Sequence, residues 1–129
     1  MSPTCHLCRY CAVVAVDDAG RILNPLLAEG QVHGGLAQGA AQALYEEVRF
    51  DDDGNPLTSN FADYAVISAT EVPMFERVMM ETPTPLNALG AKGIGEIGIT
   101  GTAAAIANAV YHATERRIRD LPITLDKLV

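Results

Sequence analysis

A glycine-rich segment near the C-terminal end carries the residue best suited to acid–base chemistry. Gly93, Gly95 and Gly98 surround one carboxylate, Glu96, and the other charge between Gly90 and Gly101 is Lys92. Glycines let the backbone approach a bulky group closely, so this carboxylate could be held rigidly in a confined site. Burial there would raise its pKa and suit it to proton abstraction. The spacing equally allows Glu96 to stabilise only the N-terminal dipole of the following helix.

The same segment satisfies the pattern G-x-G-x-x-G, but its context argues against nucleotide binding. A dinucleotide fingerprint follows a buried strand and opens a doubly wound sheet. Here the proline-rich residues 82–85 precede the glycines, and too few residues follow them to complete such a sheet. A phosphate-binding P-loop is excluded as well, because Lys92 precedes the glycines instead of following them before Ser or Thr.

The elements that position these residues can be predicted from composition and apolar spacing. We expect residues 29–35, with three glycines, to form a loop, and residues 34–48 to form the best-defined helix. A second helix should begin with Thr102 as its N-cap and continue to about Ile118. The remaining expected elements are strands at 11–17, 21–23, 65–69 and 78–81, and a tight turn at 51–56. This order predicts an α+β fold, a mixed sheet layered with two main helices.

Size and charge limit the class of protein. The 129 residues suit one folded domain, with 49% hydrophobic and 19% charged residues. A formal net charge of −7 and the lack of a basic stripe argue against nucleic-acid binding. The apolar runs are too short to span a bilayer, and no signal segment opens the sequence, which favours a cytoplasmic location.

Two clusters of potential metal ligands have simpler explanations. Cys5, Cys8 and Cys11 have an iron–sulfur-like or zinc-like spacing, with His6 among them, but no second cysteine pair follows downstream. We interpret them as free thiols in a reducing compartment. The consecutive acidic residues 51–53 lack the alternate spacing of a calcium loop, and a solvated turn explains them better.

Two segments, taken together, resemble signatures of a known enzyme family. Residues 89–98, Leu-Gly-Ala-Lys-Gly-Ile-Gly-Glu-Ile-Gly, are similar to a motif of the xanthine oxidase family of molybdenum hydroxylases. Residues 29–39, Glu-Gly-Gln-Val-His-Gly-Gly-Leu-Ala-Gln-Gly, look like that family's cofactor-facing segment. The resemblance runs from about Val14 to Val129 and indicates the last subdomain of the molybdopterin-binding domain. Residues 1–13 form a separate cysteine-containing segment without a recognised counterpart, and Ala88 stands where the family often has proline.

The resemblance implies specific roles for residues in both segments. The family's glutamate that matches Glu96 acts as a general base beside the molybdenum. The pterin dithiolene holds the metal, so no residue of this chain is expected to be a ligand, and His33 is expected to make structural hydrogen bonds. The free N–H groups at the start of the helix could receive an anionic phosphate. The residues expected to bind the cofactor are Gln31, Gly34, Gly35, Lys92, Gly93 and Gly95.

Several of these side chains have alternative roles. Gln31 can donate to and accept from pterin edges, although ordinary hydrogen bonding at the start of a helix is the other explanation, and both remain open for Gln38. Lys92 could steer anions toward the site or pair with a buried carboxylate. The sequence does not choose between the two roles of Lys92.

The resemblance also implies what lies outside this sequence. The cofactor would be molybdopterin with molybdenum, as a cytosine dinucleotide, shared with missing parts of a much longer subunit. Iron–sulfur clusters and FAD would belong to partner domains or chains. The partners would be the remainder of the molybdenum subunit or other hydroxylase subunits, with self-association possible for a truncated piece. The isolated chain should be inactive and the substrate stays open. The alternative function is a non-catalytic domain or assembly module that retains the fold and binds a partner chain.

Overall fold

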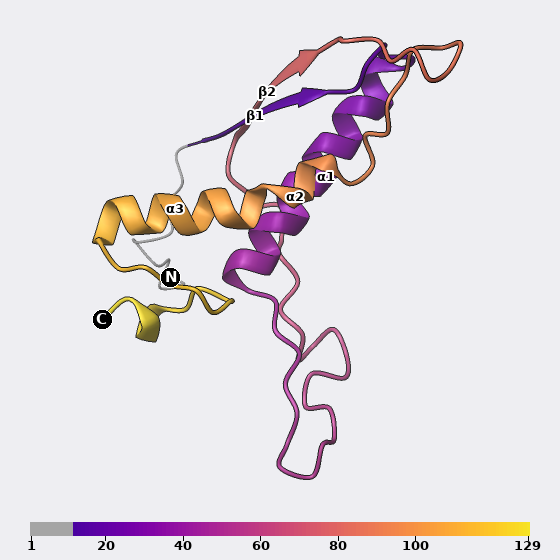
Figure 1. The fold of residues 1–129 in the computed structure, drawn as a ribbon. Helices are drawn as coiled ribbons and strands as arrows, with labels where there is room; N and C mark the ends of the chain where they lie inside the picture. Colours follow the sequence, from indigo (N-terminus) through magenta and orange to yellow (C-terminus); the bar gives the residue numbers. More distant parts are fainter. Residues whose placement is uncertain (1–11) are drawn as a thin grey trace.

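The computed structural model describes residues 12–129 (Figure 1). The element order is β1 (Val13–Asp18), α1 (Pro25–Leu44), β2 (Phe75–Met80), α2 (Ile97–Thr100), α3 (Thr102–Thr114) and a 3₁₀ turn, η2 (Leu125–Lys127). The predicted α+β class with two main helices, α1 and α3, is therefore confirmed. The described residues do not include Cys5, Cys8 and Cys11. They include only the last two residues of the predicted segment 1–13.

The sheet is a parallel pair of strands, β1 and β2, with Val13 opposite Phe75 and Asp18 opposite Met80. The expected strands at 11–17 and 78–81 correspond to β1 and β2. The predicted strands at 21–23 and 65–69 are wrong, because neither segment enters a named strand. The mixed sheet is also corrected: the two strands are parallel, since α1 and a long connection carry the chain back to the same end of the sheet.

Helix α1 begins well before the point that its apolar spacing suggested. Asn24 caps it by accepting a hydrogen bond from the Leu27 N–H at 3.2 Å, and Pro25 occupies the first turn, where its missing N–H costs nothing. The predicted loop at residues 29–35 is wrong, because this segment lies inside the helix. The helix also ends at Leu44 and does not reach Val48.

Helices α2 and α3 pack against α1 and close the small core. Gly39 of α1 faces Thr102 so tightly that a β-carbon there would lie 2.5 Å from the Thr102 Cβ. Thr102 is not the predicted N-cap: Gly101 has that position, and the buried Thr102 hydroxyl donates to the Gly98 carbonyl at 2.6 Å. Helix α3 ends at Thr114, before the expected Ile118, with Glu115 in the left-handed conformation. The core cluster consists of Ala40, Ala43, Ile106, Val110 and Ile123.

The chain between α1 and β2 extends away from the helices as a narrow arm (Figure 1). Its tip is the predicted turn: the Asp51 N–H donates to the Asn55 carbonyl at 2.9 Å, and Phe50 bridges Pro56. The Tyr64 hydroxyl donates to Glu46 at 2.8 Å and ties the returning part of the arm to its start. Among residues 12–129, no helix is long and apolar enough to cross a membrane.

Candidate functional site

A shallow pocket of about 210 Å³ lies where the end of β1, the start of α1 and the second glycine segment meet. It brings together Gln31 and Lys92, two residues that the sequence proposes for cofactor binding although they are far apart in the chain. Ile94 and Leu27 give it an apolar wall. The remaining lining residues are Ala19, Arg21, Ile22, Leu23, Asn24, Ala28 and Ala91.

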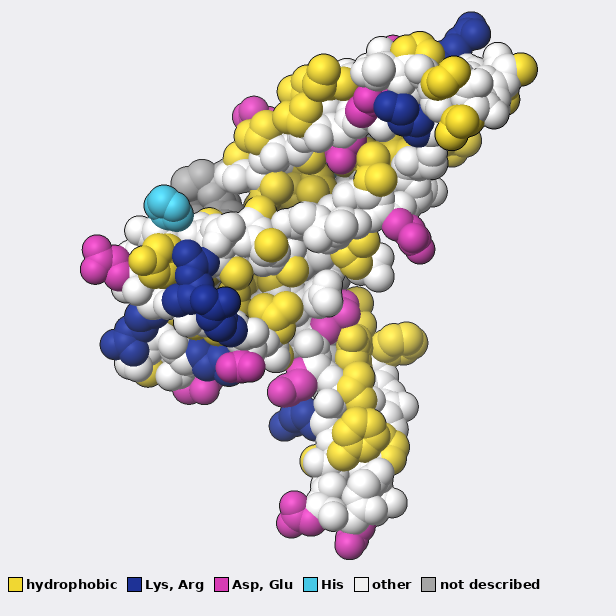
Figure 2. All heavy atoms as spheres, in the orientation of Figure 1, with side chains coloured by type: hydrophobic (Ala, Val, Ile, Leu, Met, Phe, Trp, Pro, Cys, Tyr) yellow, Lys and Arg dark blue, Asp and Glu magenta, His cyan; other side chains and the backbone are white. Residues whose placement is uncertain are grey.

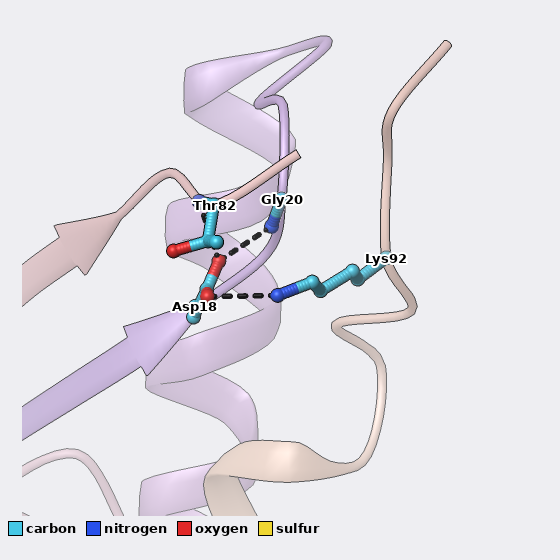
Figure 3. Close-up of polar contacts among 4 residues, drawn as sticks. All are labelled: Asp18, Gly20, Thr82 and Lys92. Carbon is cyan, nitrogen blue, oxygen red and sulfur yellow. Dashed lines mark hydrogen bonds and ion pairs between the residues drawn. The ribbon is translucent and has the colours of Figure 1, made fainter. Parts of the chain in front are cut away.

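Lys92, which lines this pocket, forms an ion pair with Asp18 at the end of β1 (Figure 3). The Lys92 ammonium lies 2.8 Å from one carboxylate oxygen of Asp18. The other oxygen accepts hydrogen bonds from the N–H groups of Gly20 at 2.8 Å and Thr82 at 3.0 Å. Lys92 first, and then these two backbone donors, hold the pKa of Asp18 well below its usual range. Of the two roles proposed for Lys92, the structure therefore shows pairing with a carboxylate, which is half-buried.

Backbone hydrogen bonds fasten the second glycine segment to the end of β1. The Arg21 N–H donates to the Gly90 carbonyl, and the Lys92 N–H donates to the Ala19 carbonyl, both at 2.9 Å. Gly20 and Gly90 have φ angles of +64° and +68°, in the left-handed region. A β-carbon at Gly20 would lie 2.4 Å from the Gly90 carbonyl oxygen, so only glycine allows the two segments to approach this closely.

The two glycine-rich motifs also touch directly, glycine against glycine. A β-carbon on Gly35 would lie 3.0 Å from the Gly98 Cα and the Ile99 N, so the absence of a side chain lets α1 and α2 pack in contact. Gly35 is buried, whereas Gly34 is exposed, and a β-carbon on Gly34 would meet nothing within 4 Å. Both lie within α1, so their N–H groups are committed to helical hydrogen bonds. The expectation of free N–H groups at this point is therefore wrong.

Gly93, Gly95 and Glu96 lie on the surface of this chain. A β-carbon at either glycine would meet nothing within 4 Å. Glu96 is exposed at the N-cap position of α2, and its side chain makes no capping hydrogen bond. It does not line the pocket that holds Gln31 and Lys92. Residues 12–129 therefore present Glu96 without enclosing it, and the burial that the general-base hypothesis requires must come from elsewhere.

The remaining candidates have structural surroundings. His33 is half-buried, and its ring centroid lies 5.8 Å from that of Phe75 on β2, which supports a structural role but replaces the expected hydrogen bond with a ring contact. Gln38 is exposed on α1. In the part of the chain that the structure describes, no group of three His, Cys, Asp or Glu residues could hold a metal ion.

Sequence reasoning missed the importance of Asp18. The strand predicted at residues 11–17 ends just before Asp18, and the partner of Asp18 lies 74 residues away at Lys92. A signal was present: an aspartate at a strand end followed two residues later by glycine often accepts that residue's N–H, as Asp18 does from Gly20.

Comparison with known proteins identifies the family. A model described as "Molybdopterin cofactor-binding domain" matches residues 6–73. The range begins inside the cysteine-containing segment and includes the first glycine motif on α1. The chain belongs to this family of molybdopterin cofactor-binding domains.

The relatives are molybdenum-binding large subunits. The chain is 45% identical over 119 residues to the aldehyde oxidoreductase molybdenum-binding subunit PaoC of Escherichia coli K12, covering 91% of this chain and 16% of that subunit. It is 42% identical over 99 residues to the carbon monoxide dehydrogenase large chain of Afipia carboxidovorans, covering 77% of this chain and 12% of the relative. The crystal structure of quinoline 2-oxidoreductase from Pseudomonas putida 86 matches with a TM-score of 0.81 and 38% identity, over 88% of this chain and 15% of that one.

These matches confirm the resemblance to the xanthine oxidase family. The matched relatives are oxidoreductases. They also show that the chain spans less than a fifth of each of these relatives. The pocket fits part of a pterin cofactor: Gln31 offers an amide donor and acceptor, Lys92 a cation and Ile94 an apolar contact. Its volume of about 210 Å³ is below the range of roughly 300–1,000 Å³ typical of enclosing ligand sites. The described residues could therefore form one wall of a cofactor site.

Proposed function

We propose that this chain is a piece of the molybdenum-cofactor-binding subunit of a molybdenum hydroxylase, corresponding to the last subdomain of its molybdopterin-binding domain. The observation that carries the proposal is the joining of the two family motifs. Residues 29–39 and 89–98 lie far apart in the sequence, yet Gly35 packs on Gly98, and Gln31 and Lys92 line one pocket.

In this proposal the pocket residues bind and orient the cofactor. Gln31 is exposed on α1 and makes no hydrogen bond to the described residues that would keep its amide from a pterin edge. Lys92 is fixed by Asp18, so its ammonium is pre-positioned and can share its remaining donors with an anionic group. Gly34, Gly93 and Gly95 leave open surface, which suits close approach of a bulky ligand. Gly35 is the exception, because it already packs against α2.

Glu96 is proposed as the general base. The hydrogen bonds of Gly90 and Lys92 to the β1 end fix the segment that leads to it, and α2 begins immediately after it. Its carboxylate would accept a proton during turnover once neighbouring parts of the subunit exclude water from it. The bound cofactor would supply the two-electron redox chemistry, and this chain would supply the positioned proton acceptor.

The proposal assigns the rest of the machinery to other polypeptide. The cofactor is proposed to be molybdopterin as a cytosine dinucleotide, shared with the larger part of the subunit, and iron–sulfur clusters and FAD are proposed for partner domains or chains. The isolated chain is then expected to be inactive, because it forms only one wall of the site. The names of the relatives, which include aldehyde and carbon monoxide substrates, do not select a substrate for this chain.

Molybdenum analysis of the native assembly tests this proposal. The chain is captured under mild conditions from its own host, and molybdenum is measured per mole of chain. We expect near-stoichiometric molybdenum together with the larger part of the subunit. Gln31→Ala should lower the molybdenum content, whereas Gln42→Ala, which removes another exposed glutamine from α1, should not. Absence of molybdenum from an intact assembly would contradict the proposal and leave a non-catalytic domain.

A further inference from the structure

The pocket beside the start of α1 is cationic in a chain that is acidic overall. Of the described residues that line it, Arg21 and Lys92 are charged, and none is acidic. The whole chain has a formal net charge of −7, but its arm, residues 45–74, holds seven acidic residues and one basic residue. The arm projects from the other end of α1 (Figure 1), whereas Figure 2 shows Lys and Arg side chains at the end where α1 begins. Most of the negative charge therefore lies away from the pocket, which can receive an anion.

Arg21 is the lining cation that has no role within the fold. Its side chain is exposed and makes no hydrogen bond or ion pair within residues 12–129, whereas Lys92 is paired with Asp18. Glu81 lies close to this segment, but its carboxylate accepts the Ile22 N–H at 3.0 Å, and Glu81 does not line the pocket. The N–H donors of the Arg21 guanidinium are therefore available to a ligand, in a planar arrangement that matches the oxygens of a phosphate group.

Two further features of the pocket favour the same kind of ligand. The Lys92 ammonium uses one donor on Asp18 and keeps two others for an anion. Asn24 and Leu27, at the start of α1, line the same pocket, and a helix of 20 residues has the positive end of its dipole there. A group with several anionic oxygens could contact Arg21 and Lys92 together, which a single carboxylate does less well.

The geometry points to Arg21 and Lys92 as a subsite for a phosphate group, with Arg21 as its principal ligand. The inference rests on the proposed function, which supplies that phosphate as part of the cofactor. The pocket volume of about 210 Å³ agrees with it, because a space of this size admits one end of a ligand and not a whole cofactor. Arg21 would then fix the position of the cofactor by its anionic end, without taking part in the chemical step.

Titration of the 129-residue chain with inorganic pyrophosphate tests the inference. Binding is followed by NMR through the amide shifts of the ¹⁵N-labelled chain at constant ionic strength, so that general charge screening does not change. Arg21→Gln removes the cation and keeps an amide. Arg119→Gln is the matched control, because Arg119 is also exposed, makes no side-chain hydrogen bond or ion pair within residues 12–129, and lies beyond α3. Acetate is titrated in parallel to represent a carboxylate ligand.

We expect saturable shifts at the pocket, in residues 19–31 and 91–94, and a dissociation constant that rises about tenfold or more in Arg21→Gln. Arg119→Gln should bind pyrophosphate as the wild type does, and acetate should bind much more weakly. Pyrophosphate that causes no saturable shift at the pocket would overturn the inference, as would unchanged binding by Arg21→Gln or acetate binding of equal strength. Arg21-dependent pyrophosphate binding in a chain whose native assembly holds no molybdenum would support the phosphate subsite and contradict the proposed function alone.

Discussion

The contact between the two glycine motifs makes a sharp prediction about α1. Gly34, Gly35 and Gly39 all lie inside this helix, but they face different surroundings. A β-carbon at Gly34 would meet nothing within 4 Å, whereas one at Gly39 would lie 2.5 Å from the Thr102 Cβ. The same substitution, glycine to alanine, should therefore have opposite effects on the free energy of unfolding at Gly34 and at Gly39.

The magnitudes follow from two opposing contributions. Alanine in a helix interior is more favourable than glycine by about 1 kcal/mol, so Gly34→Ala should stabilise the chain by about that amount. At Gly39 the same gain is opposed by overpacking, which costs about 1–3 kcal/mol, toward the upper end here because Thr102 is buried and hydrogen-bonded to the Gly98 carbonyl. We expect Gly39→Ala to lose about 2 kcal/mol. Gly35→Ala should fall between the two, since its β-carbon would lie 3.0 Å from backbone atoms.

Urea unfolding followed by far-UV circular dichroism measures these differences. The two extreme variants should differ by about 3 kcal/mol, which is more than a hundredfold in the unfolding equilibrium constant. The slope of unfolding free energy against urea should stay unchanged, showing that the variants differ in stability and not in compactness. Equal stability of Gly34→Ala and Gly39→Ala would refute the packing of α1 against α3 at Thr102.

Three further predictions follow from individual contacts. Asp18→Asn removes the charge that holds Lys92. Because the folded-state pKa of Asp18 is lowered, the stabilisation that this charge provides is present above about pH 4 and is lost below it. Wild type and variant should therefore converge in unfolding free energy as the pH falls. The Tyr64 hydroxyl donates to Glu46, which raises the pKa of Tyr64, so Glu46→Gln should lower its titration midpoint measured by NMR. Ile106 is 3% exposed in the core cluster, and Ile106→Val should cost about 0.5–1.5 kcal/mol in chemical unfolding, whereas no loss would show that this core is not packed.

The first glycine motif shows where sequence-based prediction of the fold failed. Gly30, Gly34 and Gly35 each disfavour a helix by about 1 kcal/mol relative to alanine, which favours a loop over residues 29–35. Packing reverses that preference, because Gly35 and Gly39 allow α1 to contact Gly98 and Thr102 directly. Local propensity holds no information about a neighbour that lies so much further along the chain. By contrast β1, the turn near Asp51 and most of α3 depend on local patterns and were predicted correctly.

The candidate site was predicted from a resemblance more than from physical chemistry. Spacing alone does not decide whether Glu96 acts as a general base or only stabilises a helix dipole. The sequence also does not decide between the two roles proposed for Lys92. The structure answers part of the question about Lys92, because this side chain pairs with Asp18. Only the folded chain creates that contact. The cofactor roles of Gln31 and the exposed glycines stay predictions. Glu96 stays one too, since the surroundings that would bury it are not formed by residues 12–129.

The most direct test of the central claim is turnover of the assembled enzyme carrying Glu96→Gln, with molybdenum content measured on the same preparation. We predict a fall in kcat of about 10²–10⁴-fold, the usual contribution of a general base, with molybdenum content unchanged. Glu47→Gln, at an exposed glutamate after α1, should retain the wild-type rate. A Glu96→Gln enzyme with full molybdenum content and a wild-type kcat would contradict the assignment of Glu96 as the base.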